Sequence, residues 1–145
     1  MPTLRLIRKH ESVSPSAGVK GLYMAKAILN FAVDGGAVAT ITPSRTVALP
    51  ANAVIVGGSI NSTTAVTSGG ATTIAIGTSA GSSTTSILGA TAKASFSANA
   101  LLNVVPVFAT PIKLTAQGNV TFTVATTALT AGVVEVTLFY YVASA

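Results

Sequence analysis

Short runs of β-branched and small apolar residues, separated by glycine and proline, constrain the fold of this chain more than any other feature. The runs span residues 25–33, 37–43, 46–49, 53–63, 72–78, 86–96, 103–115, 119–126 and 133–142. Glycine-rich turn sequences stand between several of them, at residues 34–36, 68–70 and 117–119, because glycine accepts backbone conformations that other residues avoid. No run shows a sustained helical period, so an all-β fold is expected.

The spacing of the runs predicts a single β-sandwich or barrel of about eight strands. In residues 119–126, Val120, Phe122 and Val124 are expected on one face and the intervening residues on the other. Gly57-Gly58 predicts a bulge or bend. Residues 86–96 are ambiguous and could contain one helical turn. Residues 103–115 hold two prolines, which suits an edge strand, and residues 133–142 are expected to form the longest strand.

The chain is unusually poor in charge, since 8% of its residues are Asp, Glu, Lys or Arg, whereas an average domain has about 25%. A monomer with so few charges is expected to be poorly soluble, because net charge opposes self-association. We therefore expect other copies, or a larger assembly, to cover much of the surface. A monomer kept in solution by its Ser and Thr hydroxyls is the alternative.

The basic residues are concentrated at the front of the chain. Residues 1–26 carry +4 and residues 27–145 carry +1. Residues 12–21 mix Ser, Pro and Gly without apolar periodicity, which is typical of an extended linker. The sequence is therefore divided into a basic, extended N-terminal arm (residues 1–23) and a folded β body (residues 24–145).

The arm has three interpretations. It could bind nucleic acid by neutralising phosphates, dock on an acidic protein surface, or be a solvated tail. The body adds little positive charge, so nucleic-acid binding is the weakest of these and is not predicted. Apolar residues between the charges favour strand addition or docking to a protein. The predicted partner-binding residues are Leu4, Arg5, Leu6, Ile7, Arg8 and Lys9.

Several function classes lack the residues that they need. The chain has no Cys, one His and three acidic residues, so no metal site and no cofactor is predicted. No apolar run reaches the length of about 18 residues that a membrane span requires, so no membrane partner is predicted.

One short string matches the nucleophile motif of serine hydrolases. Gly77-Thr78-Ser79-Ala80-Gly81 has the G-x-S-x-G pattern, but these enzymes also need an acid and then a histidine further along the chain. The only histidine, His10, lies upstream, so Ser79 lacks a general base. Residues 77–86 are therefore interpreted as a hairpin loop, and no enzymatic activity is predicted.

Three successive aromatic residues, Phe139, Tyr140 and Tyr141, lie near the end of the last run. Such a triplet could stack on a base or a sugar. Alternation along a strand more often places one member in the core and the others at an interface. These three residues are the predicted oligomer interface.

The sequence from Met24 onward resembles the small decoration (cement) proteins of tailed bacteriophage heads. The resemblance rests on the segments MAKAILNFAVDGGAVATITPS, ALPANAVIVGGSINSTTAVTSGGATTIAIGTSAGS and FTVATTALTAGVVEVTLFYYV. It implies a jelly-roll-like β domain that forms a homotrimer and has no enzymatic activity. It also implies that the trimer binds the major capsid protein on the outer surface of the expanded head. Residues 1–23 depart from the compact form of the family.

The leading hypothesis is therefore a virion protein, made in the cytoplasm of the host bacterium, that stabilises the capsid and contacts neighbouring trimers through its arm. The alternative is a trimeric head- or tail-spike or receptor-binding module that uses Tyr140, Tyr141 and the loops at residues 62–71 and 79–86. A serine hydrolase acting through Ser79 is the third hypothesis.

Overall fold

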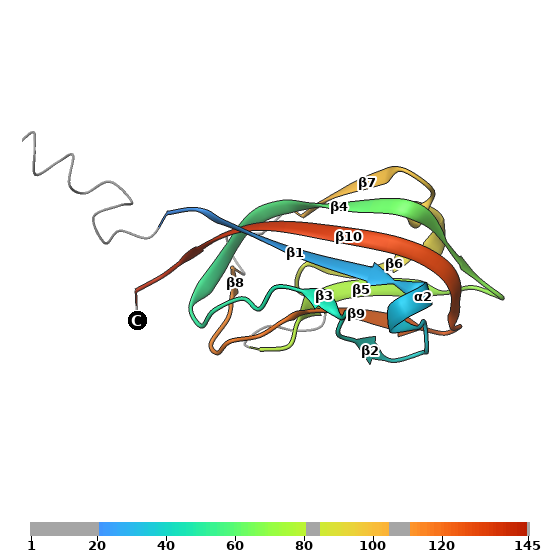
Figure 1. Ribbon diagram of the computed structural model, residues 1–145, viewed down its shortest axis with the longest axis horizontal. Coiled ribbons are helices and arrows are strands. Elements are labelled where there is room, and N and C mark those ends of the chain that lie inside the picture. The colour runs from blue at the N-terminus through green and yellow to red at the C-terminus, as the bar shows by residue number, and fades with distance from the viewer. Residues whose placement is uncertain (1–20, 81–84, 105–110, 145) are drawn as a thin grey trace, which may run out of the picture.

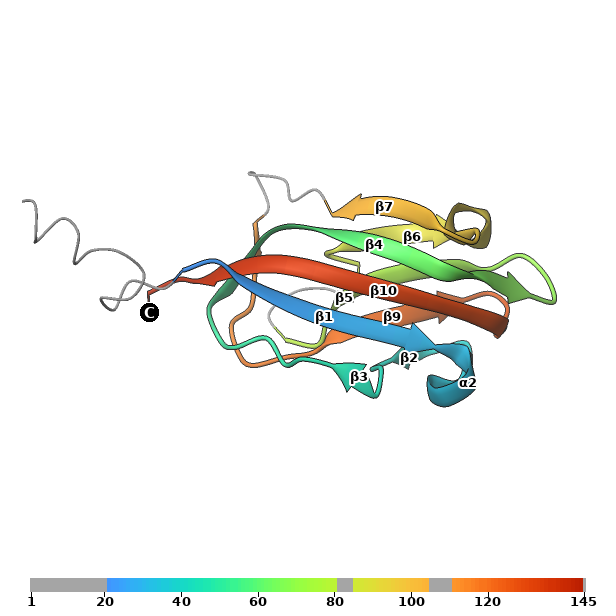
Figure 2. The same ribbon diagram turned by 45° about the horizontal axis from the view of Figure 1, so that its top comes forward.

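The computed structural model describes residues 21–80, 85–104 and 111–144, which form a sandwich of two antiparallel β-sheets (Figures 1 and 2). The elements are β1 (Tyr23–Asn30), α2 (Phe31–Asp34), β2 (Thr40–Ile41), β3 (Arg45–Thr46), β4 (Ala53–Ser68), β5 (Thr73–Thr78), β6 (Leu88–Ala92), the 3₁₀ helix η2 (Lys93–Phe96), β7 (Ala100–Val104), β8 (Ile112–Lys113), β9 (Val120–Ala125) and β10 (Leu129–Val142). The predicted all-β sandwich is confirmed.

The strands are divided unequally between the sheets. The larger sheet has the order β3-β1-β10-β4-β7, with β8 pairing β4, and the smaller has the order β2-β9-β5-β6. Strands that are neighbours in the sheets are mostly distant in the sequence, because the chain crosses repeatedly from one sheet to the other. The first and last described strands pair along the whole length of β1, from Tyr23 opposite Tyr140 to Asn30 opposite Val133.

The core lies between the sheets. Its members are the side chains that alternation along each strand points inward. On β9, Val120, Phe122 and Val124 are buried in the core as predicted. β10 contributes Leu129, Val134, Val136, Leu138 and Tyr140 to the core. Among the described residues, Phe96 and Phe122 are the largest side chains that are fully buried. Burial of this apolar surface supplies most of the free energy that favours folding.

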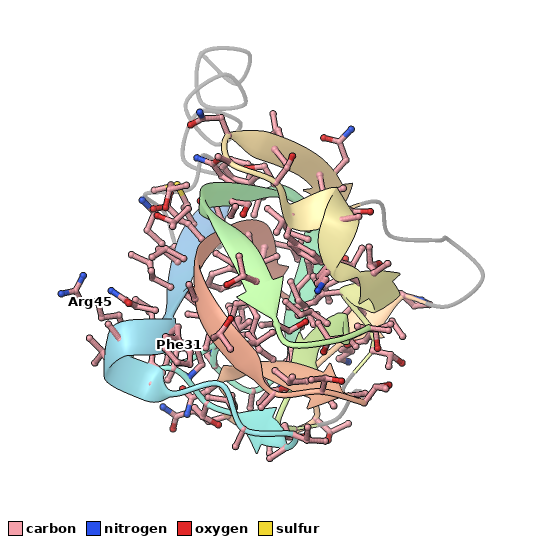
Figure 3. All side chains as sticks on the ribbon, turned by 90° about the vertical axis from the view of Figure 1, so that its right-hand side faces the viewer. Phe31 and Arg45 are labelled. Carbon is pink, nitrogen blue, oxygen red and sulfur yellow. The ribbon has the colours of Figure 1, made fainter. Side chains whose placement is uncertain are left out.

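The end of the first predicted strand is helical, so the extended prediction for residues 31–33 was wrong. The Asn30 side chain accepts a hydrogen bond from Ala32 N at 3.0 Å and thereby caps the start of α2. Gly35 ends the turn with a φ of 78°, and its N–H donates to Phe31 O at 3.0 Å. Figure 3 views this end of the molecule, with Phe31 labelled.

A bulge interrupts the pairing of β4 with β10. Phe139 lies opposite Gly57 and Tyr140 lies opposite Ile55, so Val56 is the extra residue. The bulge predicted at Gly57-Gly58 is therefore present one residue earlier. β4 runs on to Ser68 rather than ending near residue 63, and at 16 residues it exceeds the 14 of β10, which had been predicted as the longest strand.

The ambiguous segment 86–96 contains both a strand, β6, and the single turn of η2. Lys93 at the start of η2 holds the turn between β4 and β5. Its ammonium donates to Ser68 O at 3.1 Å, to Ser68 Oγ at 2.9 Å and to Gly70 O at 2.7 Å. Of the predicted run 103–115, β7 forms an edge of the larger sheet and β8 adds two paired residues, while residues 105–110 lie outside the described chain.

Asp34 connects α2 to the loop before β3. Its carboxylate accepts hydrogen bonds from Asn30 N at 2.9 Å and from Ser44 N at 2.8 Å. Partial burial raises the pKa of Asp34, but these hydrogen bonds and the nearby Arg45 outweigh burial and hold the pKa below its ordinary value of 3.8. The ionised form is thus the one that the fold favours.

This shift predicts acid sensitivity at one end of the sandwich. A lowered native pKa stabilises the fold above the ordinary value, and the contribution is lost as pH falls through the native pKa. The free energy of unfolding of Asp34→Asn should therefore depend less on pH below about pH 4 than that of the unaltered protein. Denaturant titrations across this range test this, with Glu135→Gln as the control that also removes one carboxylate. The assignment would be contradicted if the free energies of unfolding of the unaltered protein and of Asp34→Asn fell equally as the pH drops in this range.

Candidate docking surface

An apolar patch lies on the outer face of the larger sheet. It belongs to the end of the sheet where β1 begins and β10 ends, and Figure 1 shows that end of the ribbon. Its members are Met24, Val56, Phe139 and Tyr141, which are 62%, 45%, 40% and 41% exposed. We call these four residues the outer patch. Large apolar side chains that gather on an outer face are typical of a contact surface.

Strand pairing brings the outer patch together. Met24 on β1 lies opposite Phe139 on β10, and Phe139 in turn lies opposite Gly57 on β4. Tyr141 follows Phe139 by two residues and therefore points to the same face. The bulge leaves Val56 without a partner on β10 and exposed beside this row. Three strands thus contribute to one surface.

The aromatic triplet is divided between the core and the outer patch. Tyr140 is 9% exposed and belongs to the core, whereas Phe139 and Tyr141 point outward. The Tyr140 ring packs against Tyr23, with ring centroids 5.6 Å apart. The structure therefore brings two of the three predicted interface residues to the surface. That Phe139, Tyr140 and Tyr141 form an oligomer interface remains a prediction.

Sequence reasoning missed Met24 and Val56. Met24 had been placed at the boundary of the arm, and its role becomes visible only when β1 is known to pair with the last strand. Val56 sits in a run that alternates poorly, and its exposure depends on the bulge. The one signal in the sequence was the bulge or bend predicted at Gly57-Gly58. That signal does not indicate which side chain the bulge turns outward.

The outer edge of β1 is open next to the patch. β3 pairs with β1 only at Ala27 and Ile28, and Val47 N donates to Lys26 O at 3.1 Å just before them. Within the described ranges, no strand lies beside Tyr23–Ala25 on the side away from β10. Leu22, which precedes β1, is 65% exposed. We call Leu22 to Ala25 the open edge.

A few charged residues lie near the outer patch and the open edge. Lys26 Nζ lies 2.8 Å from Glu135 Oε1 on the outer face, with side chains 47% and 26% exposed. Arg45 projects from the body on β3 (Figure 3). A surface pocket of about 320 Å³ is lined by Lys26, Ile28, Ser44, Arg45, Thr46 and Val47. Exposed ion pairs such as Lys26–Glu135 add about 0–1 kcal/mol to stability.

Ser79, the residue of the hydrolase-like string, is bound to the backbone of the turn before β9. Its Oγ accepts a hydrogen bond from Asn119 N at 2.8 Å, and its own N–H donates to Asn119 O at 2.9 Å. This places Ser79 in a structural contact between the ends of β5 and β9. His10 lies outside the described residues.

Other predicted sites fall partly or wholly beyond the structure. The arm residues Leu4, Arg5, Leu6, Ile7, Arg8 and Lys9 lie outside the described residues, as do residues 81–84 of the loop at 79–86. The segment 62–71 is the second half of β4 and its turn rather than a long loop. In the portion of the chain that is described, no group of three acidic, histidine or cysteine residues could hold a metal ion, and no helix has the length and apolarity to cross a membrane.

The fold is shared with chains from three bacteriophage capsid structures. The cyanophage Pam1 capsid asymmetric unit contains a chain with a TM-score of 0.62 and 20% identity over 86% of this chain and 87% of that one. The acid-stable capsid of Helicobacter pylori bacteriophage KHP30 contains one with a TM-score of 0.59 and 17% identity, covering 87% and 91%. The capsid of Ralstonia phage GP4 contains one with a TM-score of 0.55 and 18% identity, covering 85% and 86%. No protein-family model and no curated protein matches the sequence.

Proposed function

We propose that this chain is a structural protein of a bacteriophage virion that binds the outer surface of the capsid as a trimer and stabilises the expanded head. The observation that carries the proposal is the shared fold with chains from three phage capsid structures. The aligned shares of the two chains are nearly equal in each comparison, so those chains are about as long as this one. A small capsid component of this size suits a decoration protein.

The strand order supports a jelly roll. A jelly roll has eight strands in two sheets, connected as two Greek keys. When the two-residue strands β3 and β8 are set aside, the larger sheet reads β1-β10-β4-β7 and the smaller reads β2-β9-β5-β6. We infer that this arrangement is a jelly roll in which β3 and β8 are short additions to the larger sheet.

Surface chemistry also supports a protein that is covered in its working state. The described body has four cationic and two acidic residues, and the outer patch exposes two aromatic side chains. Aromatic residues are enriched among those that contribute most to binding at protein interfaces. The proposed oligomer contact therefore runs through Phe139 and Tyr141, with Tyr140 supporting them from the core.

The proposed mechanism is mechanical and needs no catalysis or cofactor. A trimer that engages the lattice of the major capsid protein through three subunits gains avidity, so each contact needs only modest affinity. Binding to the expanded lattice alone stabilises that lattice by linkage. Trimers that bridge adjacent capsomers would then oppose the outward pressure of packaged DNA.

The number of copies per particle tests the proposal. We expect close to one copy per major capsid subunit in purified particles, because a protein that coats the lattice must follow its repeat. Quantitative mass spectrometry of purified virions, with the major capsid protein as the internal standard, gives this ratio. A count of a few to a few tens per particle would instead support the spike or receptor-binding module.

The N-terminal arm is proposed to strengthen binding to neighbouring subunits. Among the described residues the buried core begins at Ala25, and we expect deletion of residues 1–20 to leave the midpoint of thermal unfolding nearly unchanged. The same deletion removes four cationic residues and one acidic residue. We expect it to lower the fraction of binding sites that the protein occupies on capsid shells without DNA. Equal occupancy by the truncated and full-length proteins would contradict the role of the arm.

A further inference from the structure

We infer that the open edge of β1 is a strand-addition site, and that its occupant is the apolar segment around Leu4 and Leu6 of a second copy of this chain. The inference goes beyond the capsid role, because it requires only two copies of the chain. It concerns backbone pairing at an edge of the sheet, whereas the proposed role of the outer patch concerns side chains on its face.

The backbone at the open edge is available for pairing. An edge strand presents N–H and C=O groups that can pair with another chain. β3 covers β1 only from the Val47–Lys26 hydrogen bond onward, so the start of β1 has β10 on one side and, among the described strands, none on the other. A short extended segment would continue the line of β3 along the same edge of the sheet.

The side chains at this edge are apolar. Leu22, Tyr23 and Met24 are 65%, 40% and 62% exposed, and Val47, whose N–H donates to Lys26 O, is 53% exposed. Proteins usually protect open edges with charged residues, proline or a covering loop. This edge instead exposes three consecutive apolar residues. That pattern is expected of an edge that pairs with another strand in the assembled protein.

The N-terminal segment has the pattern needed to pair there. Leu4 and Leu6 are two residues apart, as are Leu22 and Met24, so in extended chains each pair lies on one face of a sheet. Cross-strand apolar pairs then form on that face.

An arm from a second copy can lie along the open edge without folding back on its own β1. The 14 residues from Ile7 to Lys20 span up to about 45 Å when extended, which is enough to reach an adjacent subunit. Each copy offers one arm and one open edge, so the contact is head-to-tail, and such contacts close into rings when the rotation allows. This geometry is compatible with a trimer and covers the open edge of every subunit.

Cysteine cross-linking in the full-length chain tests the inference, because the natural sequence contains no cysteine. The test variant carries Leu6→Cys and Met24→Cys. The matched control carries Leu6→Cys and Leu101→Cys, since Leu101 is 67% exposed on β7 at the opposite edge of the same sheet. Both partner positions are exposed, so neither substitution should prevent folding. The purified proteins are oxidised at equal concentration and analysed by non-reducing gels and intact mass.

We expect the test variant to form covalent dimers and higher multiples, at least fivefold more than the control. Equal cross-linking of the two variants would overturn the inference, because it would show no preference for the open edge. A disulfide within a single chain, seen as a monomer lighter by two hydrogen atoms, would also overturn it, since the arm would then occupy the edge of its own body. A further Leu4→Asp substitution in the test variant should reduce the cross-link, and an unchanged yield would count against apolar pairing.

Discussion

Gly58→Ala is expected to destabilise the protein by about 3 kcal/mol or more, which lowers the midpoint of thermal unfolding by roughly 10 °C. The Cβ that alanine adds would overlap the carbonyl oxygen of Thr137 and would lie 3.1 Å from Cα of Leu138. Both atoms belong to the backbone of β10, which is the partner of β4 at the centre of the larger sheet. Relief therefore requires the two strands to separate locally, which weakens the ladder that joins them.

Gly57→Ala is the matched control for this prediction. Gly57 is the preceding residue of the same strand, and a Cβ there would have its nearest neighbour, Val104 O, at 3.9 Å. The substitution tests the general effect of alanine on β4 without the clash. Thermal and urea unfolding of the three proteins give the comparison. Equal stability of Gly58→Ala and Gly57→Ala would show that β4 and β10 do not approach each other as closely as described.

Replacing both exposed aromatic residues of the outer patch, as Phe139→Thr with Tyr141→Thr, is expected to dissociate the proposed trimer. Threonine is β-branched and therefore also suits a strand, but it removes most of the apolar area. Loss of an aromatic residue that anchors an interface typically costs about 2 kcal/mol or more, and the double substitution acts at every interface of a symmetric trimer. Sedimentation velocity at micromolar concentration measures the change from trimer to monomer.

Val33→Thr serves as the control for the outer patch. Val33 is 59% exposed on α2, at the end of the sandwich away from the start of β1 (Figure 1), and its replacement should leave the trimer intact. Circular dichroism of each variant establishes that the β fold is retained, as expected for exposed positions. A folded double variant that remains fully trimeric would contradict the assignment of Phe139 and Tyr141 to the oligomer interface.

The elements that the sequence predicted best are those whose side chains alternate. β5 and β9 were predicted within about one residue, because both sequences alternate with the period of two that a strand requires. The prediction failed at residues 31–33, where Asn30 and Asp34 bind the backbone and favour a helical turn. It also ended β4 too early, since Ser and Thr near residues 62–68 resemble a turn sequence. In the structure Ser62 Oγ instead donates to Phe96 O at 3.0 Å and is buried.

The candidate docking surface was harder to predict, because its members come from strands that are distant in the sequence. Phe139 and Tyr141 stood out as aromatic residues, but Met24 joins them only through the pairing of β1 with β10. The open edge depends equally on pairing, since it exists because β3 is two residues long. Local patterns indicate which face of a strand is buried, whereas the identity of its neighbours is a property of the whole topology.

The pairing of β1 with β10 also has a kinetic consequence. During synthesis β1 cannot complete its ladder until β10 has emerged from the ribosome, because Tyr23–Asn30 pairs with residues 133–140. Contacts between residues so far apart in the sequence slow folding, so the sandwich should close only after β10 has been synthesised. The same connectivity means that unfolding must separate β1 from β10, which are neighbours inside the larger sheet. Once closed, the protein is therefore expected to unfold slowly and to persist long after its synthesis has ended.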